Sequence, residues 1–327
     1  AWAAFAVMSV VWGGSYLLIK IAVDGGMPAL DLAWLRIAMA AAILAAIAWR
    51  RGTLATLRGR WRWILAYAVA EMSVPFPLIA AGEVHVASSL AAIIIAAVPL
   101  LVTVISLRVD PSERPTPLRA AGLAIGFVGV VALVGIDVAG SSEELLGALA
   151  VLGGAVGYAI GPIVLKLGMD GIDARVAMGA SLVLATILLA PLAIADAPVR
   201  TPTLGAIAAV VALGVVCTAL AFVVYTMLVR EAGTGRATII TYVNPLVAVV
   251  LGMTLLGERP GPYALGGLGA ILAGSWLATG GRLPRRRLPS GPAPGPPGGS
   301  PGGSRAPSVR ASQPVDSGRC HPPRLLD

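Results

Sequence analysis

Two ionisable side chains stand inside long apolar stretches of the sequence, where a charge is costly. Glu71 lies near the middle of the stretch 63–81, and Arg36 lies about one and a half turns into the stretch 31–49. An ionised carboxylate at the centre of a membrane helix costs on the order of 3 kcal/mol, so such residues are expected to face a cavity or a partner. Burial favours the neutral carboxyl group, which makes Glu71 a candidate for taking up and releasing a proton.

Arg36 suits a planar carboxylate, because its guanidinium group can donate two parallel hydrogen bonds. We interpret it as a contact for a substrate carboxylate, or as the partner of Asp31 or another acid. The alternative is an arginine whose long side chain reaches the lipid headgroups. For Glu71 the alternative is a hydrogen-bonded structural acid. Lys20 and Lys166 lie close to helix ends, where a lysine can reach the interface.

Aromatic and amide side chains within the apolar stretches are candidates to line a substrate pathway. A site for an organic molecule is mostly apolar, with a few polar groups that orient the ligand. With Glu71 and Arg36, the predicted pathway residues are Trp12, Tyr16, Trp34, Tyr242 and Asn244.

Prolines at matching positions of two apolar stretches are candidate hinges. Pro99 and Pro245 lie 146 residues apart, and each removes one backbone hydrogen bond from its helix. Pro75 follows Glu71 in the same stretch and opens the helix there. We predict hinges at these three prolines, beside the pathway.

Residue types that enzymes need are scarce in this chain. The two histidines are His85, predicted in a loop, and His321 in the C-terminal tail. Two cysteines, Cys217 and Cys320, are too few for a disulfide framework. Ser15 has no evident base, and no set of metal ligands is apparent. We predict no catalytic residue and no metal; the alternative readings are an intramembrane enzyme, a channel or a scaffold subunit.

The elements that carry these residues are predicted to be membrane helices. Hydrophobic residues make up 57% of the chain, charged residues 12%, and the mean hydropathy is +0.87. Because about 20 apolar residues cross a bilayer, we predict an all-α integral membrane protein with ten transmembrane helices. The apolar stretches are 3–23, 31–49, 63–81, 87–107, 118–136, 145–166, 175–195, 204–229, 237–256 and 262–280.

Lysine and arginine concentrate in alternate loops, sixteen on one side against three on the other. The positive-inside rule therefore predicts that both termini are cytoplasmic. Basic residues cluster between apolar segments and in the tail, so the net charge of +8 does not indicate nucleic-acid binding. Only two of the 24 basic residues are lysine, which favours a GC-rich bacterium and its plasma membrane.

The stretch 282–327 is rich in proline, glycine, serine and arginine, with few aliphatic residues. It cannot bury enough apolar surface to fold alone, so we predict a disordered cytoplasmic tail.

The chain contains an internal repeat. "KIAVDG" at 20–25 recurs as "KLGMDG" at 166–171, an offset of 146 residues. "VPLLV" recurs as "NPLVA" at the same offset, and "ERP" recurs at an offset of 145 residues. We predict two five-helix repeats, 1–140 and 141–281. Since five is odd, the second repeat enters the membrane from the opposite side, and such inverted repeats are typical of secondary transporters.

Small residues at helical spacing predict close helix contacts in two of the apolar stretches. The glycines predicted to make these contacts are Gly122, Gly126, Gly266 and Gly274.

Both repeats resemble the EamA type of transporter in the drug/metabolite transporter superfamily. The resemblance implies ten helices around a central cavity, no cofactor, and export or exchange of amino acids, metabolites or drugs. Arg36 matches the arginine that begins span 2 in that family, while no acid is expected at Glu71. The stretches that carry the resemblance include "VWGGSYLLIKIAV", "LAWLRIAMAAAIL", "ASSLAAIIIAAVPLLVTVIS" and "TALAFVVYTMLVREAGTGRATIITYVNPLVAVVLGMTLLGERPGPYALGGLGAILAGSWL".

We therefore predict a secondary transporter that moves a small organic metabolite, an amino acid or a drug across the plasma membrane by alternating access. Its partners are a small-molecule substrate, the lipid bilayer and protons, and its direction is export.

Overall fold

The computed structural model describes most of the predicted apolar stretches. The described residues are 2–50, 57, 59–109, 116–133, 141–169, 172, 174–196, 201–232 and 240–279. Within these ranges the regular elements are all helices. The predicted tail 282–327 and several of the basic loops lie outside them. The helices belong to one compact unit, Ala1–Pro284.

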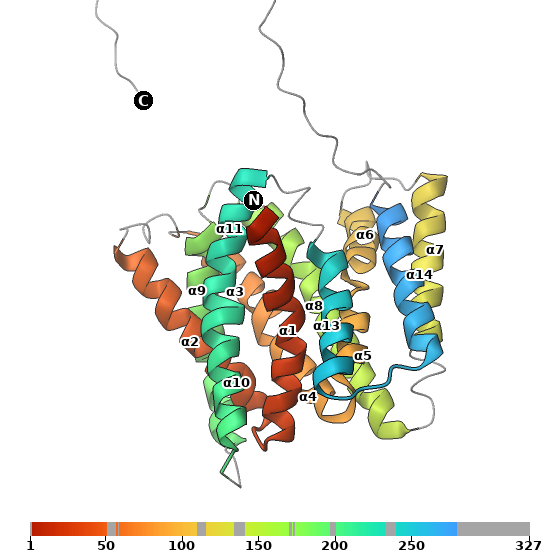
Figure 1. The fold of residues 1–327 in the computed structure, drawn as a ribbon. Helices are drawn as coiled ribbons and strands as arrows, with labels where there is room; N and C mark the ends of the chain where they lie inside the picture. Colours follow the sequence, from red (N-terminus) through yellow and green to blue (C-terminus); the bar gives the residue numbers. More distant parts are fainter. Residues whose placement is uncertain are drawn as a thin grey trace, which may run out of the picture. The chain divides into compact units, whose positions relative to one another are not determined.

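The helices follow one another in two comparable series (Figure 1). The first series is α1 (Trp2–Asp24), α2 (Ala29–Arg50), α3 (Trp61–Ala68), the π-helical segment η2 (Val69–Ser73), α4 (Pro75–His85), α5 (Ser88–Ile95), α6 (Val98–Val109) and α7 (Pro117–Ala132). The second series is α8 (Ser142–Gly168), α9 (Ala174–Ala195), α10 (Leu204–Gly214), the π-helical segment η5 (Val215–Leu220), α11 (Ala221–Ala232), α13 (Ile240–Leu255) and α14 (Pro262–Ala278).

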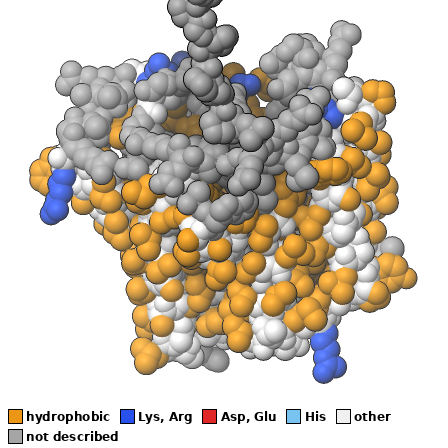
Figure 2. All heavy atoms as spheres, turned by 45° about the horizontal axis from the view of Figure 1, so that its top comes forward, with side chains coloured by type: hydrophobic (Ala, Val, Ile, Leu, Met, Phe, Trp, Pro, Cys, Tyr) orange, Lys and Arg blue, Asp and Glu red, His pale blue; other side chains and the backbone are white. Residues whose placement is uncertain are grey.

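Length and hydropathy confirm a membrane fold. Seven helical segments are long and apolar enough to cross a bilayer, and α7, α13 and α14 are shorter apolar helices. Each of these three helices adjoins a stretch outside the described residues. Among the described residues visible in Figure 2, hydrophobic side chains cover much of the surface, and the lysine and arginine side chains lie near its margins. Such a surface suits lipid rather than water.

The two series pack against each other reciprocally. Helix α1 of the first series contacts α10, α11 and α13 of the second. Helix α8, its counterpart in the second series, contacts α3, α4, α5 and α6 of the first. The remaining helices pair with their own counterparts, α2 with α9 and α7 with α14. In Figure 1, α1 and α8 run in opposite directions. This exchange of roles is what two inverted copies related by a twofold axis produce.

Glycines bring α7 and α14 into close contact. A Cβ atom on Gly274 would lie 2.6 Å from the carbonyl oxygen of Gly122, and Gly274 also adjoins the backbone of Gly126. Gly266 does not share this contact, because nothing lies within 4 Å of its Cβ position. Gly267 takes its place, since a Cβ atom there would lie 3.0 Å from the carbonyl oxygen of Gly129. Gly267 lies seven residues before Gly274, which is nearly two helical turns, so the two glycines share one face of α14. Gly266 lies eight residues before Gly274 and about 80° away from it around the helix, so the prediction for Gly266 was wrong.

A helix interruption accompanies one of the two paired prolines that are predicted as hinges. In the first repeat the helix is interrupted at Ala96 and Ala97, and α6 restarts just before Pro99. In the second repeat α13 continues through Pro245 from Ile240 onward. Among the described residues, an interruption beside the paired prolines therefore occurs at Pro99 alone.

Candidate functional site

Each repeat carries a π-helical segment in the middle of its third membrane helix. Val69–Ser73 and Val215–Leu220 begin 146 residues apart, at the period of the sequence repeat. Short π-helical segments inside α-helices occur frequently at functional sites. Their recurrence in both repeats indicates a functional site in the middle of the membrane.

Different residues account for the two π-helical segments. Pro75 and Pro77 lack the N–H groups that would bond to the carbonyls of Glu71 and Ser73 in an α-helix. The second segment contains no proline. There the hydroxyl of Thr218 donates to the carbonyl of Leu213, at 2.8 Å. The prolines were visible in the sequence, whereas the second segment had no comparable signal.

Arg36 is buried beside the second π-helical segment and α4, with 8% of its surface exposed. Its Nε donates a hydrogen bond to Oγ1 of Thr218, at 2.8 Å, and its guanidinium carbon lies 4.2 Å from the centre of the Phe76 ring. No carboxylate of the described residues lies within ion-pair distance of it. Arg36 therefore neither pairs with Asp31 nor reaches the headgroups, and its remaining N–H groups are available to a ligand.

Aromatic rings extend from Arg36 toward Glu71. Tyr158 of α8 packs against Phe76, with ring centres 6.3 Å apart. Tyr158 is close enough to both Arg36 and Glu71 to interact electrostatically with each. It is thus within electrostatic range of both the buried cation and Glu71.

Glu71 lies in the first π-helical segment and faces α8. Its Oε2 is buried and has no hydrogen-bond partner among the described residues, and its carboxylate adjoins Gly161. Tyr67 and Tyr225 are also within electrostatic range of this carboxylate. Since the described residues give Oε2 no hydrogen bond, they supply no partner for the alternative of a hydrogen-bonded structural acid.

The other predicted pathway residues divide into two groups. Trp12 packs on Phe222 and Tyr225, at ring-centre distances of 6.1 and 5.0 Å, which connects it to the surroundings of Glu71. Tyr16 interacts electrostatically with Tyr158 and Arg36. These two aromatic side chains therefore lie around the same central region as Arg36 and Glu71.

The remaining candidates contact neighbouring helices. Trp34 donates from Nε1 to the carbonyl of Thr186 in α9, at 3.0 Å. Tyr242 reaches α14, with its hydroxyl 3.1 Å from Oγ1 of Thr279. Asn244 has a buried Oδ1 without a hydrogen-bond partner among the described residues. Trp34 and Tyr242 thus make contacts between helices, and the structure does not bring them to Arg36.

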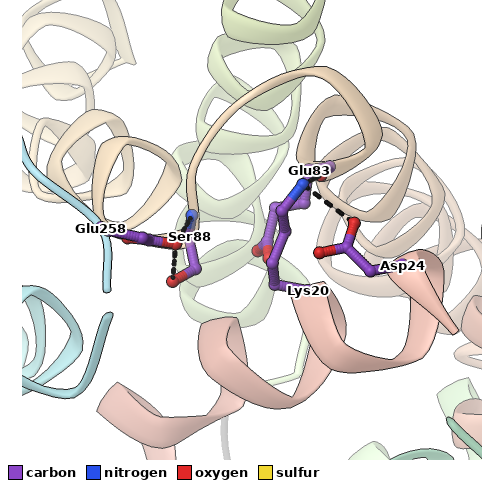
Figure 3. Close-up of polar contacts among 5 residues, drawn as sticks. All are labelled: Lys20, Asp24, Glu83, Ser88 and Glu258. Atoms are coloured by element: carbon purple, nitrogen blue, oxygen red, sulfur yellow. Dashed lines mark hydrogen bonds and ion pairs between the residues drawn. The ribbon is translucent and has the colours of Figure 1, made fainter. Parts of the chain in front are cut away.

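A second polar cluster, which the sequence did not reveal, lies at one end of the bundle (Figure 3). Lys20 donates from Nζ to the main-chain oxygen of Glu83, at 2.9 Å, and forms an ion pair with Asp24, at 3.1 Å. The sequence prediction ended this helix at residue 81 and placed His85 in a loop, whereas α4 continues to His85. Glu83 is therefore a helix residue in the protein interior, and the absence of a turn-forming residue between 83 and 86 was the available signal.

Glu258 caps helix α5 from the opposite repeat (Figure 3). One carboxylate oxygen accepts from the N–H and the hydroxyl of Ser88, both at 2.8 Å, and the other accepts from the N–H of Ser89, at 2.9 Å. A carboxylate stabilises a helix N-terminus through its free N–H groups and the helix dipole. Burial alone would raise the pKa of Glu258, but the hydrogen bonds from Ser89 and Ser88 hold that pKa below its ordinary value.

The turn that presents Glu258 depends on Gly257. Gly257 has a φ of +66°, in the left-handed region that favours glycine. The N–H of Glu258 donates to the carbonyl of Gly252, at 3.1 Å, which closes the end of α13. Gly252 also leaves room for the carboxylate, since a Cβ atom there would collide with Oε2 of Glu258.

We expect Glu258→Gln to speed amide hydrogen exchange at Ser88 and Ser89. The amide has one acceptor oxygen in place of two, so at least one of the capping N–H groups loses its partner. Because the folded-state pKa of Glu258 is lowered, the cap is fully present above the ordinary glutamate pKa and is lost as pH falls through the lowered value. Exchange measured by mass spectrometry on peptides covering 87–95 tests this.

The control for this prediction is Glu144→Gln, which removes an exposed carboxylate at the start of α8. Exchange at 87–95 should be the same in this variant and in the unaltered protein. Equal exchange in Glu258→Gln and Glu144→Gln would show that the cap does not protect α5.

Comparison with known proteins agrees with the fold. A model of the EamA-like transporter family matches residues 1–135 and again residues 145–280. A probable terminal-alkyne amino-acid exporter of Streptantibioticus cattleyicolor is 32% identical over 300 residues, covering 86% of this chain and 94% of that protein. The uncharacterized inner membrane transporter YedA of Escherichia coli K12 is 30% identical over 282 residues, covering 84% and 88%.

A solved crystal structure has the same fold. It superposes with a TM-score of 0.59 at 22% sequence identity, over 85% of this chain and 95% of that chain. A two-copy helical membrane fold and relatives named as transporters define the chain as a membrane transporter. The chain belongs to the EamA-like transporter family, which confirms the resemblance to the drug/metabolite transporters.

Proposed function

We propose that this protein is a secondary transporter that exports a small organic molecule bearing a carboxylate, by alternating access. The observation that carries the proposal is the buried Arg36, which has one hydrogen bond, one aromatic contact and no carboxylate of the described residues at ion-pair distance. A buried cation without a counter-ion is costly, so an anionic ligand that pairs with it gains correspondingly.

The opposite side of the same region suits a positive group. Glu71 offers a buried carboxylate oxygen without a hydrogen-bond partner among the described residues, and tyrosine rings surround it. Aromatic faces and a carboxylate together attract an ammonium group. A ligand that presents a carboxylate to Arg36 and an ammonium group to Glu71 is an amino acid.

The name of one relative supports this substrate class. One relative is named as a probable exporter of terminal-alkyne amino acids. In our proposal the present chain likewise moves an amino acid outward. Amino acids are thus selected from the wider set of substrates predicted from the sequence, which also included drugs and other metabolites. The predicted placement in the bacterial plasma membrane, with both termini cytoplasmic, follows the positive-inside rule and belongs to the same proposal.

The reciprocal packing of the repeats supports alternating access. When two copies are related by a twofold axis in the membrane plane, exchanging their conformations turns an outward-open state into an inward-open one. We propose that residues 1–140 and 141–281 are the two copies, with Pro75, Pro99 and Pro245 at the hinges and Arg36 near the point where the copies meet.

Counterflow in proteoliposomes tests the proposal. Vesicles preloaded with an unlabelled neutral amino acid should accumulate the labelled amino acid transiently. The matching amine without the carboxylate, and the matching acid without the amino group, should give little or no accumulation. A nucleoside provides a control of unrelated chemistry. Counterflow of the amine at the rate of the amino acid would contradict the role of Arg36, and no counterflow with any compound would contradict the transporter mechanism.

A channel is distinguished by the same measurement. Channels conduct ions as unitary currents and do not exchange one solute for another across a closed barrier. Unitary conductance without counterflow would therefore favour the channel alternative over a carrier.

A further inference from the structure

Glu83 is the most deeply buried acid among the described residues. Its exposed fraction is 0%, and neither carboxylate oxygen has a hydrogen-bond partner in the part of the chain that the structure describes. A charged carboxylate in such a position would cost several kcal/mol unless a cation paired with it. With no such partner at hydrogen-bond distance, this conformation suits the protonated carboxyl group.

A cation stands beside Glu83 but is engaged elsewhere. The ammonium group of Lys20 bonds to the main-chain oxygen of Glu83 and to the carboxylate of Asp24, and not to the carboxylate of Glu83. Figure 3 shows the Glu83 side chain next to the stem of Lys20. Lysine has a flexible four-carbon stem, so a change of rotamer can move its ammonium group from one carboxylate to the other.

The two possible partners of Lys20 differ in their access to water. The side chain of Asp24 is 57% exposed, whereas that of Lys20 is 19% exposed and Glu83 is fully buried. Asp24 can therefore remain charged in water without Lys20. Glu83 can become charged at low cost only when Lys20 turns toward it.

Other charged groups surround Glu83 from several elements. Those that act on its carboxyl group are Lys20 and Asp24 of α1, Arg36 of α2 and Glu258 of the loop before α14. Tyr16 of α1 lies within electrostatic range, and His85 ends the same helix. On α8, which packs against α4, the acids near this end are the exposed Glu143 and Glu144. Lys20 is the one cation among the described residues whose ammonium group already reaches the backbone of Glu83.

We propose that the Glu83 carboxyl group binds the proton that is exchanged for substrate, and that Lys20 moves from Asp24 to the Glu83 carboxylate when this proton leaves. In this step the O–H bond of Glu83 breaks and the proton passes to water at the end of the bundle. The electron pair stays on Glu83, whose new charge is neutralised by Lys20. The exchange with substrate rests on the proposed transport function, whereas the proton site itself does not.

Infrared spectroscopy detects this proton without any substrate. In difference spectra of the full-length protein in lipid, recorded as a pH titration, the unaltered protein should show the carbonyl band of a protonated carboxylic acid that disappears at alkaline pH. Glu83→Gln should remove this band, Glu83→Asp should shift it, and Glu144→Gln, which changes an exposed carboxylate, should leave it in place. Lys20→Met should make the band persist to higher pH by about one unit or more, because the cation that stabilises the carboxylate is gone.

The outcomes separate the two proposals. A titrating band that survives in Glu83→Gln, or no titrating band in the unaltered protein, would overturn the proton site. If the rate of amino-acid counterflow in the unaltered protein did not change with pH, the exchange of proton for substrate would be overturned. When the infrared band behaves as expected but no solute shows counterflow, the proposed function fails and the proton site stands.

Discussion

Replacing Arg36 by methionine is expected to raise the half-saturating concentration for amino-acid counterflow about thirtyfold or more. Truncating one partner of a buried, hydrogen-bonded charge pair costs about 2–5 kcal/mol, and each 1.4 kcal/mol is a factor of about ten. Arg36→Lys keeps the charge but loses the planar fork, so a rise of about tenfold is expected. Counterflow rates measured against substrate concentration give these values.

Arg50 provides the matched control, because it lies on the same helix and is exposed at its end. Arg50→Met and Arg50→Lys should leave the half-saturating concentration unchanged. Size-exclusion chromatography shows whether each variant remains folded. A folded Arg36→Met protein with unaltered concentration dependence would exclude Arg36 as the carboxylate contact.

Replacing Gly274 by valine is expected to destabilise the protein by about 1–3 kcal/mol or more. Its Cβ position lies against the backbone of Gly122 and Gly126, which cannot move aside as a side chain can. A domain of this size loses about 2–4 °C of melting temperature per kcal/mol, so the midpoint should fall by several degrees. Thermal unfolding of the purified protein, followed by loss of monodisperse material, measures the change.

Gly266→Val is the control for the same helix. Nothing lies within 4 Å of the Gly266 Cβ position, so the added side chain meets open space. Its melting temperature should stay close to that of the unaltered protein, or rise slightly, because valine replaces glycine inside a helix. Equal losses in both variants would mean that the contact between α7 and α14 does not hold the repeats together.

Bulk properties of the sequence were enough to predict the membrane fold. Apolar stretches of bilayer length and the repeat at 146 residues depend on composition and spacing, which no tertiary contact can hide. For Arg36 the sequence left two alternatives, burial in the interior or extension to the interface, and the structure shows burial.

Positions that depend on the rotation of a helix were predicted less well. Gly266 and Gly267 are neighbours in the sequence but point about 100° apart around the helix, and the spacing of small residues does not determine which of them faces α7. Trp34 and Tyr242 have the residue types expected in a pathway and contact α9 and the end of α14, which the sequence did not indicate; their place in the pathway stays a prediction. Sequence gives the residue type at a position, whereas its direction depends on how the helix packs.

Glu83 escaped prediction for a different reason. A carboxylate a few residues from the expected end of a membrane helix is normally read as a loop residue. In the structure α4 extends to His85, and the packing of α4 against α1 and α8 encloses the carboxyl group. The sequence between 83 and 86 could have indicated the longer helix, but the tertiary contacts with α1 and α8 are needed to show that its end is interior.

The π-helical segment at Val69–Ser73 also sets the angular register of everything after it in the same membrane helix. A π turn contains about one residue more than an α turn, and one residue corresponds to about 100° of rotation. The faces of α3 and α4 are therefore offset from each other. If the extra residue were absent, α4 would turn by this angle, and the side of α4 that carries Glu83 would no longer face the protein interior. A local irregularity one turn long thus decides which carboxyl group, ten residues further on, lies inside the protein.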